Sequence, residues 1–169
     1  QGESPLMTIT KDQTAAISKA MKDRYGDQVM VDFCMRYGNP STDSVIRRLQ
    51  EQGCERLLFF PLYPQYSAAT TATVNDKTFE SLMATRFMPA IRTVPAYHDE
   101  PVYIEALARS IEGHFSTLDY VPEKLIASYH GIPQSYFKKG DPYHCQCQKT
   151  SRLLEQRLGW EKGRLITCF

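Results

Sequence analysis

The stretch "RLLFFPLYPQYS", residues 56–67, decides the predicted fold, because it opens with a nearly continuous apolar run. A run of this kind is typical of a strand that is buried on both faces, as in parallel sheets. Polar and turn-forming residues, "PQYS" at 64–67, follow the run directly. In open parallel sheets ligands bind beyond the carboxyl ends of the strands. The stretch therefore predicts both a central strand and one edge of a binding site.

Helical and strand patterns alternate along the rest of the chain, on both sides of this stretch. Strands linked by helices pair in parallel through right-handed crossovers. We therefore predict an α/β fold with a three-layer, Rossmann-like arrangement, in which helices flank a parallel sheet. The predicted strands are 28–35, 56–63, 91–97, 124–129 and 164–169, and the predicted helices are 10–25, one after the turn at 39–44, 67–83, one from Pro101, and 146–158.

The composition of the 169 residues is that of a globular domain, with 42% hydrophobic and 23% charged residues. A formal net charge of +1 lacks the basic footprint of nucleic-acid binding, so no nucleic-acid partner is expected. No apolar stretch has the length of a spanning helix. Five cysteines, an odd number, favour free thiols in a reducing, cytoplasmic compartment over a disulfide framework.

Polar side chains follow each predicted strand that ends at the expected ligand edge. They are Arg36 and Tyr37, Gln65, Tyr66 and Ser67, His98, and His130 with Gly131. His130 has two interpretations that the sequence leaves open: a chemical group, or a strand-end histidine that bonds to a backbone carbonyl. For Arg36 a structural ion pair is as plausible as a role in binding. His98 stands beside acidic residues before a helix, which predicts a solvated position.

Two other sequence features bear on metal or cofactor binding. In "HCQC", 144–147, a helical backbone would point the Cys145 and Cys147 side chains about 200° apart, so they would not share one ion. The glycine patterns of dinucleotide and triphosphate sites, GxGxxG and GxxxxGK[ST], do not occur. No bound cofactor is predicted.

Three blocks of the sequence resemble the ferrochelatase family, which inserts ferrous iron into protoporphyrin IX. They are "MRYGNPSTDSVIRRLQEQG", "LLFFPLYPQYSAATTATVND" and "SYHGIPQSYFKKGDPYHCQC". They resemble the bacterial form most, and the similarity extends over essentially the whole chain. The "SYHGIPQ…GDPYHCQC" block is the most specific of the three.

The resemblance implies a fold of two similar α/β domains with a cleft between them. The catalytic histidine of the family falls on His130, which is also the residue expected to face the metal. The resemblance further implies that porphyrin and ferrous iron are the substrates. The other residues that it places at the porphyrin are Arg36, Tyr37, Gln65, Tyr66, Ser67, Gly131 and Pro133.

The chain also departs from the family pattern. The family carries a second key glutamate in an "SDxxET"-like motif, and no such motif occurs here. Some relatives ligate an iron–sulfur cluster through a cysteine after "PQYS", where this chain has Ala68, so no cluster is expected. The chain starts without Met and ends in "LITCF", so we expect the middle part of a longer protein. The predicted division is 1–120, a first chelatase domain, and 121–169, the start of a second.

The resemblance and the residues together predict a metal chelatase, with the fragment alone expected to be inactive. His130 would either face the metal or accept pyrrole protons, and the sequence does not separate these roles. The alternative is a non-catalytic module that binds a tetrapyrrole or a metal, or a chelatase for another porphyrin such as coproporphyrin. Peripheral membrane contact and oligomeric state are left open.

Overall fold

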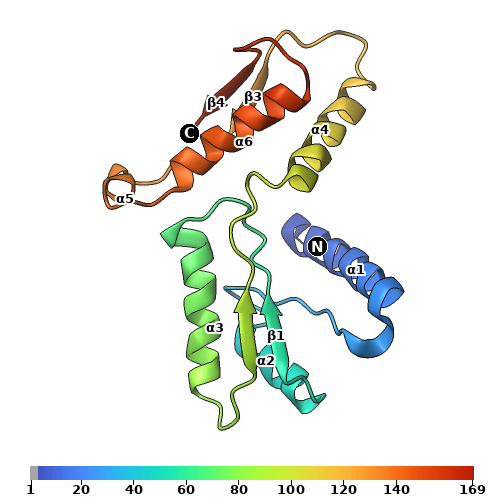
Figure 1. Ribbon diagram of the computed structural model, residues 1–169, viewed down its shortest axis with the longest axis vertical. Coiled ribbons are helices and arrows are strands. Elements are labelled where there is room, and N and C mark those ends of the chain that lie inside the picture. Colours follow the sequence, from blue (N-terminus) through green and yellow to red (C-terminus); the bar gives the residue numbers. More distant parts are fainter. Residues whose placement is uncertain (1–3) are drawn as a thin grey trace. The chain divides into compact units, whose positions relative to one another are not determined.

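The computed structural model describes residues 4–169, which form helices and short strands in alternation (Figure 1). Two compact units are present. One comprises the described part of Gln1–Leu57 together with Asn75–Ile91, and the other comprises Leu58–Val74 and Arg92–Phe169. In chain order the elements are α1 (Pro5–Tyr25), α2 (Thr42–Glu51), β1 (Arg56–Phe59), α3 (Thr73–Met83), β2 (Ala90–Thr93), α4 (Pro101–Phe115), β3 (Leu125–Ser128), α5 (Gln134–Lys138), α6 (Tyr143–Arg157) and β4 (Leu165–Cys168).

Helix α1 begins earlier than the predicted residue 10, because its capping signal lies upstream. The Ser4 side chain accepts a hydrogen bond from the Met7 amide, and Pro5 occupies the first turn, where a missing N–H costs nothing. Residue 10, the predicted start, lies inside the helix, where the Thr10 hydroxyl donates to the Leu6 carbonyl at 2.8 Å. The predicted start of this helix was therefore too late.

Strands β1 and β2 form a two-stranded sheet. The Ala90 amide donates to the Glu55 carbonyl and the Val94 amide to the Phe59 carbonyl, both at 2.8 Å. The bonded residue numbers increase in the same direction along both strands, so the pair is parallel. The prediction that this stretch is buried on both faces was wrong: Leu57 is buried, whereas Leu58 is 68% exposed. Successive side chains of a strand point to opposite faces, and residues 4–169 cover only the face of β1 on which Leu57 lies.

The predicted strand at 28–35 does not form. Among the described residues the segment pairs only through an isolated bridge between Met35 and Ser41, which closes a short loop. Its β-branched and aromatic residues suit a strand, but a strand also needs a neighbour to complete its hydrogen bonds. No neighbouring strand lies along 29–34 in the part of the chain that the structure describes.

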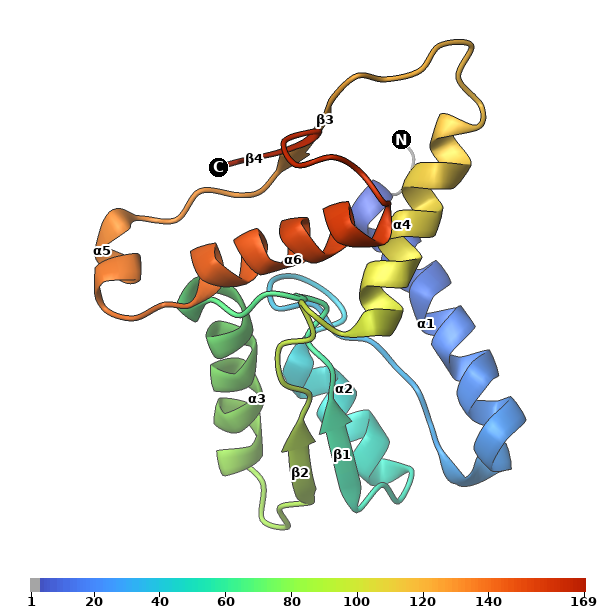
Figure 2. The same cartoon turned by 45° about the horizontal axis from the view of Figure 1, so that its top comes forward.

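Strands β3 and β4 pair in parallel, in the register Leu125↔Leu165 to Ser128↔Cys168. Helices α4 and α6 pack together, and α6 lies against β4 (Figure 2). The core between them consists of Ala108, Leu154 and Leu165, with Leu125 and Ala127 packed against it. Residues on the opposite face of the same pair, such as Ile126 at 63%, are exposed. The sheet therefore has one covered face among the described residues.

The fold class predicted from the sequence is confirmed: the protein has parallel sheets flanked by helices. Helix α5, between β3 and α6, was not predicted. The division into domains at residue 120 stays a prediction, since the two compact units are assembled from interleaved segments. No helix formed by residues 4–169 has the length and apolarity needed to cross a membrane.

An exposed ion network joins α4 to α6 and leads to a prediction about acid stability. Glu105 accepts hydrogen bonds from Arg157 and Arg109, which lower the pKa of its carboxyl from 4.5 to about 2. Because the folded-state pKa is depressed, the network stabilises the fold above pH 4.5, and this contribution is lost as the pH falls toward about 2.

We expect the Glu105→Gln variant to melt at a lower temperature than the unmodified protein at neutral pH, with a modest difference because the pair is exposed. The difference should shrink as the pH is lowered through this range and as salt is added. Thermal unfolding at several pH values measures it, with Glu123→Gln, which changes an exposed glutamate, as the control. A difference that does not depend on pH would contradict the assignment.

Candidate functional site

His130 lies just beyond the carboxyl end of β3, as predicted, and its side chain is exposed. Its Nδ1 is 2.7 Å from the carbonyl oxygen of Gly131. A carbonyl oxygen only accepts, so Nδ1 carries the hydrogen, and in the neutral imidazole Nε2 then holds the free lone pair. The backbone contact that the sequence left as an alternative is therefore present, and it orients the ring. The geometry leaves Nε2 able to take a proton or to bind a metal ion.

Gly131 and Pro133 continue the exposed segment after His130 and lead into α5. A Cβ atom at Gly131 would meet the Phe169 backbone at 3.9 Å, an ordinary contact. The close approach that a glycine permits is therefore not needed within the described part of the chain. The expected contact of both residues with the porphyrin stays a prediction.

The loop after β1 is tied to the start of α6 by three of its residues. The Gln65 Nε2 donates to the Thr150 hydroxyl at 3.0 Å, and the Tyr66 amide donates to Gln146 Oε1 at 2.7 Å. Ser67 is only 1% exposed, and its hydroxyl donates to Asp141. The side chains of Gln65 and Ser67 are thus occupied by the protein itself, and a role toward substrate stays a prediction for all three residues.

Four half-buried tyrosines gather in the unit that contains His130. Burial raises the pKa of Tyr97 to about 12 and that of Tyr143 to about 12. Burial also raises the pKa values of Tyr103 and Tyr129. Edge-on ring contacts join Tyr97 to Tyr103, with centroids 5.6 Å apart. These phenols therefore stay neutral at physiological pH and present apolar rings with hydroxyl groups that donate hydrogen bonds.

Tyr143 connects the first turn of α6 to the histidine segment. Its amide donates to Asp141 Oδ1 at 3.0 Å. The pKa of its phenol, raised mainly by burial, is also influenced by hydrogen bonding to the Cys147 thiol and to the His130 backbone. Through Tyr143 and Asp141, the segment that carries His130 and the loop that carries Ser67 share one set of contacts.

Arg36 and Tyr37 lie in the loop closed by the Met35–Ser41 bridge, in the other compact unit. The Arg36 guanidinium carbon stands 4.5 Å from the centroid of the Tyr37 ring, and its Nη2 donates to the Tyr37 hydroxyl. Tyr37 is 72% exposed. The structure therefore brings these two residues together as a cation–π pair, and their contact with a porphyrin stays a prediction.

The structure corrects the prediction for His98 and shows the surroundings of Cys145 and Cys147. The His98 side chain is only 12% exposed, so the prediction of a solvated residue was wrong, and desolvation lowers its pKa. Its backbone carbonyl accepts from Thr150, which holds the segment after β2 against α6. Cys145 is exposed and Cys147 is fully buried on α6, so the two thiols face different surroundings.

Sequence reasoning missed the residues that organise this region: Asp141, Tyr143, Gln146 and Thr150. They lie in the "GDPYHCQCQKT" segment, residues 140–150. The predictions for this segment concerned its cysteines and its resemblance to ferrochelatases, and none concerned its polar side chains. One signal was available, since an aspartate two residues before a helix suits capping of the first turn. The loop residues that Asp141 and Gln146 contact lie at least 73 positions away in the sequence, so local spacing could not predict these pairs.

Comparison with known proteins decides the family, since the ferrochelatase family model matches residues 1–169. The chain belongs to the ferrochelatase family. It is 60% identical over 167 residues to the ferrochelatase of Rhizobium meliloti (strain 1021), covering 99% of this chain and 49% of that protein. Identity is 61% over 168 residues to the ferrochelatase of Agrobacterium fabrum (strain C58 / ATCC 33970) and 59% over 168 residues to that of Rhodobacter capsulatus, each over 99% of this chain and 48% of the relative. The chain thus spans about half the length of the curated ferrochelatases it matches.

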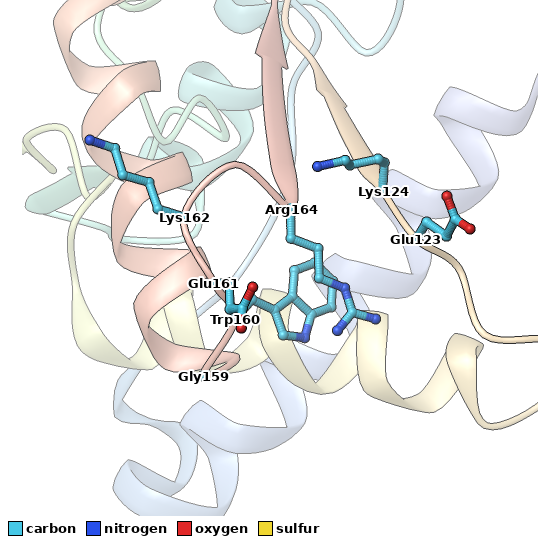
Figure 3. Close-up of a pocket in the computed structure, with 7 residues that line it drawn as sticks. All are labelled: Glu123, Lys124, Gly159, Trp160, Glu161, Lys162 and Arg164. Carbon is cyan, nitrogen blue, oxygen red and sulfur yellow. The ribbon is translucent and has the colours of Figure 1, made fainter.

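A cavity of about 320 Å³ lies elsewhere in this ferrochelatase-family chain (Figure 3). Glu123 and Lys124 precede β3 and Arg164 precedes β4, so the cavity lies at the amino ends of these strands, whereas His130 follows the carboxyl end. The Arg164 guanidinium covers the Trp160 ring at 4.4 Å from its centroid. The residues that line the cavity are Glu123, Lys124, Gly159, Trp160, Glu161, Lys162 and Arg164.

Proposed function

We propose that this chain is part of a ferrochelatase, a lyase-type metal chelatase that inserts ferrous iron into protoporphyrin IX to form protohaem. The observation that carries the proposal is that the His130 imidazole is exposed at a strand end and that its Nε2 holds a free lone pair. The family assignment supports the same activity. Porphyrin and ferrous iron are the proposed substrates, and the cytoplasm is the proposed compartment.

Metal insertion makes three demands on the protein. Two pyrrole N–H groups must lose their protons, the macrocycle must bend so that a nitrogen lone pair points outward, and the iron must exchange water for nitrogen ligands. A neutral imidazole accepts protons near pH 7 and also ligates iron. We assign His130 to the metal-facing side of the porphyrin, where Nε2 would take a pyrrole proton or guide the incoming ion.

The remaining groups would bind and shape the macrocycle. The Arg36 guanidinium would pair with a propionate, and the exposed Tyr37 ring would pack on the flat face of the porphyrin. Bending the ring uses on the order of 1–5 kcal/mol of binding energy from contacts remote from the metal. The neutral tyrosines near the loop after β1 suit an apolar substrate, because they present rings without charge.

The activity is tested by mixing protein, protoporphyrin IX and ferrous iron without oxygen and following the absorbance spectrum. We expect the full-length protein to convert the porphyrin bands into those of protohaem over time. The 169-residue chain, about half the length of its relatives, is expected to shift the Soret band on binding without forming haem. A full-length protein that binds porphyrin but forms no haem would instead support a non-catalytic binding module.

A further inference from the structure

Asp141 occupies a junction between two segments of the candidate site. Its Oδ2 accepts hydrogen bonds from the Ser67 hydroxyl at 3.0 Å and from the Ala68 amide at 2.8 Å. Its Oδ1 accepts from the Tyr143 amide at 3.0 Å. All three donors and the carboxylate belong to one compact unit. Both oxygens of one carboxylate are therefore used to join the loop after β1 to the first turn of α6.

We propose that Asp141 is a positioning residue that holds the loop Gln65–Ala68 in the conformation that meets the porphyrin. This inference rests on the proposed function and on the prediction that Gln65, Tyr66 and Ser67 contact the porphyrin. Asp141 acts through the loop and does not itself touch the reacting atoms. The Ser67 hydroxyl shows how closely the loop is specified, since it accepts from the Ala69 amide at 3.2 Å while it donates to Asp141.

Two further contacts support the same role for the start of α6. Gln146 and Thr150 bind the backbone of Tyr66 and the side chain of Gln65, one and two turns into the helix. Gln65 is 8% exposed, and its hydrogen bond to Thr150 is buried, whereas the bond from the Tyr66 amide to Gln146 is partly buried. The loop then enters a π-helical turn, Ala68–Ala72, before α3 begins. The carboxylate thus binds Ser67, the residue before this turn, and Ala68, its first residue.

The chemistry of the carboxylate makes the isosteric change Asp141→Asn informative. An amide group has one accepting oxygen and one donating nitrogen. If the oxygen faces Ser67 and Ala68, the NH₂ group opposes the Tyr143 amide; if the amide is flipped, NH₂ opposes Ala68. Either orientation sets a donor against a donor, so the variant must lose at least one contact while keeping nearly the same shape.

The test uses the full-length protein and two measurements. Hydrogen exchange at the Ala68 or the Tyr143 amide, whichever faces the NH₂ group, is expected to become faster by about tenfold or more in Asp141→Asn, with exchange in α4 unchanged, because a charge-assisted hydrogen bond is lost locally. The protoporphyrin dissociation constant, measured by fluorescence quenching, is expected to rise by about tenfold. In turnover the porphyrin KM should rise more than kcat falls.

Matched variants keep the result interpretable. Asp119→Asn alters an exposed aspartate and should leave both measurements unchanged. Gln146→Ala cuts the same loop at the Tyr66 amide, and it should loosen the loop with a smaller loss of affinity even if Asp141→Asn does not fold. Unchanged exchange at both the Ala68 and the Tyr143 amides, or faster exchange with unchanged porphyrin affinity, would overturn the proposal. Porphyrin affinity does not depend on turnover, so a protein that inserts no iron would refute the proposed activity separately.

Discussion

Replacing His130 by alanine is expected to abolish iron insertion by the full-length protein while porphyrin binding stays largely intact. The imidazole is exposed beyond β3. Because Nδ1 donates to the Gly131 carbonyl, Nε2 holds the free lone pair. A positioned acid–base group contributes about 10²- to 10⁴-fold to a rate, so we expect kcat to fall by at least about 100-fold. Anaerobic haem formation measures the rate, and fluorescence quenching by porphyrin measures binding.

The control for this variant is His114→Ala, which changes another exposed histidine at the end of α4. It should keep normal turnover and normal binding. Near-normal turnover of His130→Ala would reject the assignment of His130. A variant that lost porphyrin binding together with turnover would instead point to a role in holding the substrate.

Truncation of Leu154 is expected to produce the largest loss of stability. Leu154 is 5% exposed on α6 and packs with Ala108 of α4 and Leu165 of β4, so it joins three elements of one unit. Leu154→Ala removes buried methyl groups and leaves a cavity, which together cost about 2–5 kcal/mol in the free energy of unfolding. Urea denaturation of the full-length protein measures the change.

Gln156→Ala, at an exposed position on the same helix, is the matched control and should change the free energy of unfolding little. The loss in Leu154→Ala should appear as a shift of the urea midpoint with an unchanged slope. A cost well below the cavity range would mean that this core repacks around the smaller side chain.

Elements with a strong local signal were predicted well from the sequence. Pro101 marks the start of α4, and the apolar run "RLITCF" contains β4. Predictions failed where the outcome depends on distant neighbours. The segment 28–35 has strand composition but finds no partner along 29–34 within the described residues, and Leu58 is exposed in a stretch predicted to be buried.

The candidate site follows the same division. His130 was found at a strand end because the pattern places it there, and its hydrogen bond to Gly131 is local in sequence. The burial of His98 is a tertiary outcome, because it depends on which elements pack over the segment after β2. The Ser67–Asp141 contact joins residues 74 positions apart, so local sequence patterns could not predict it either.

The sequence by itself determined the alternation of helices and strands, the parallel class of sheet and the strand-end position of His130. Periodicity, capping and turn residues act over a few positions, so they can be recognised along the chain. Only the tertiary structure decided that Asp141 binds the loop at Ser67 and Ala68 and which face of β3–β4 is covered. Those outcomes arise from contacts between segments far apart in sequence, and local spacing carries no information about such pairings.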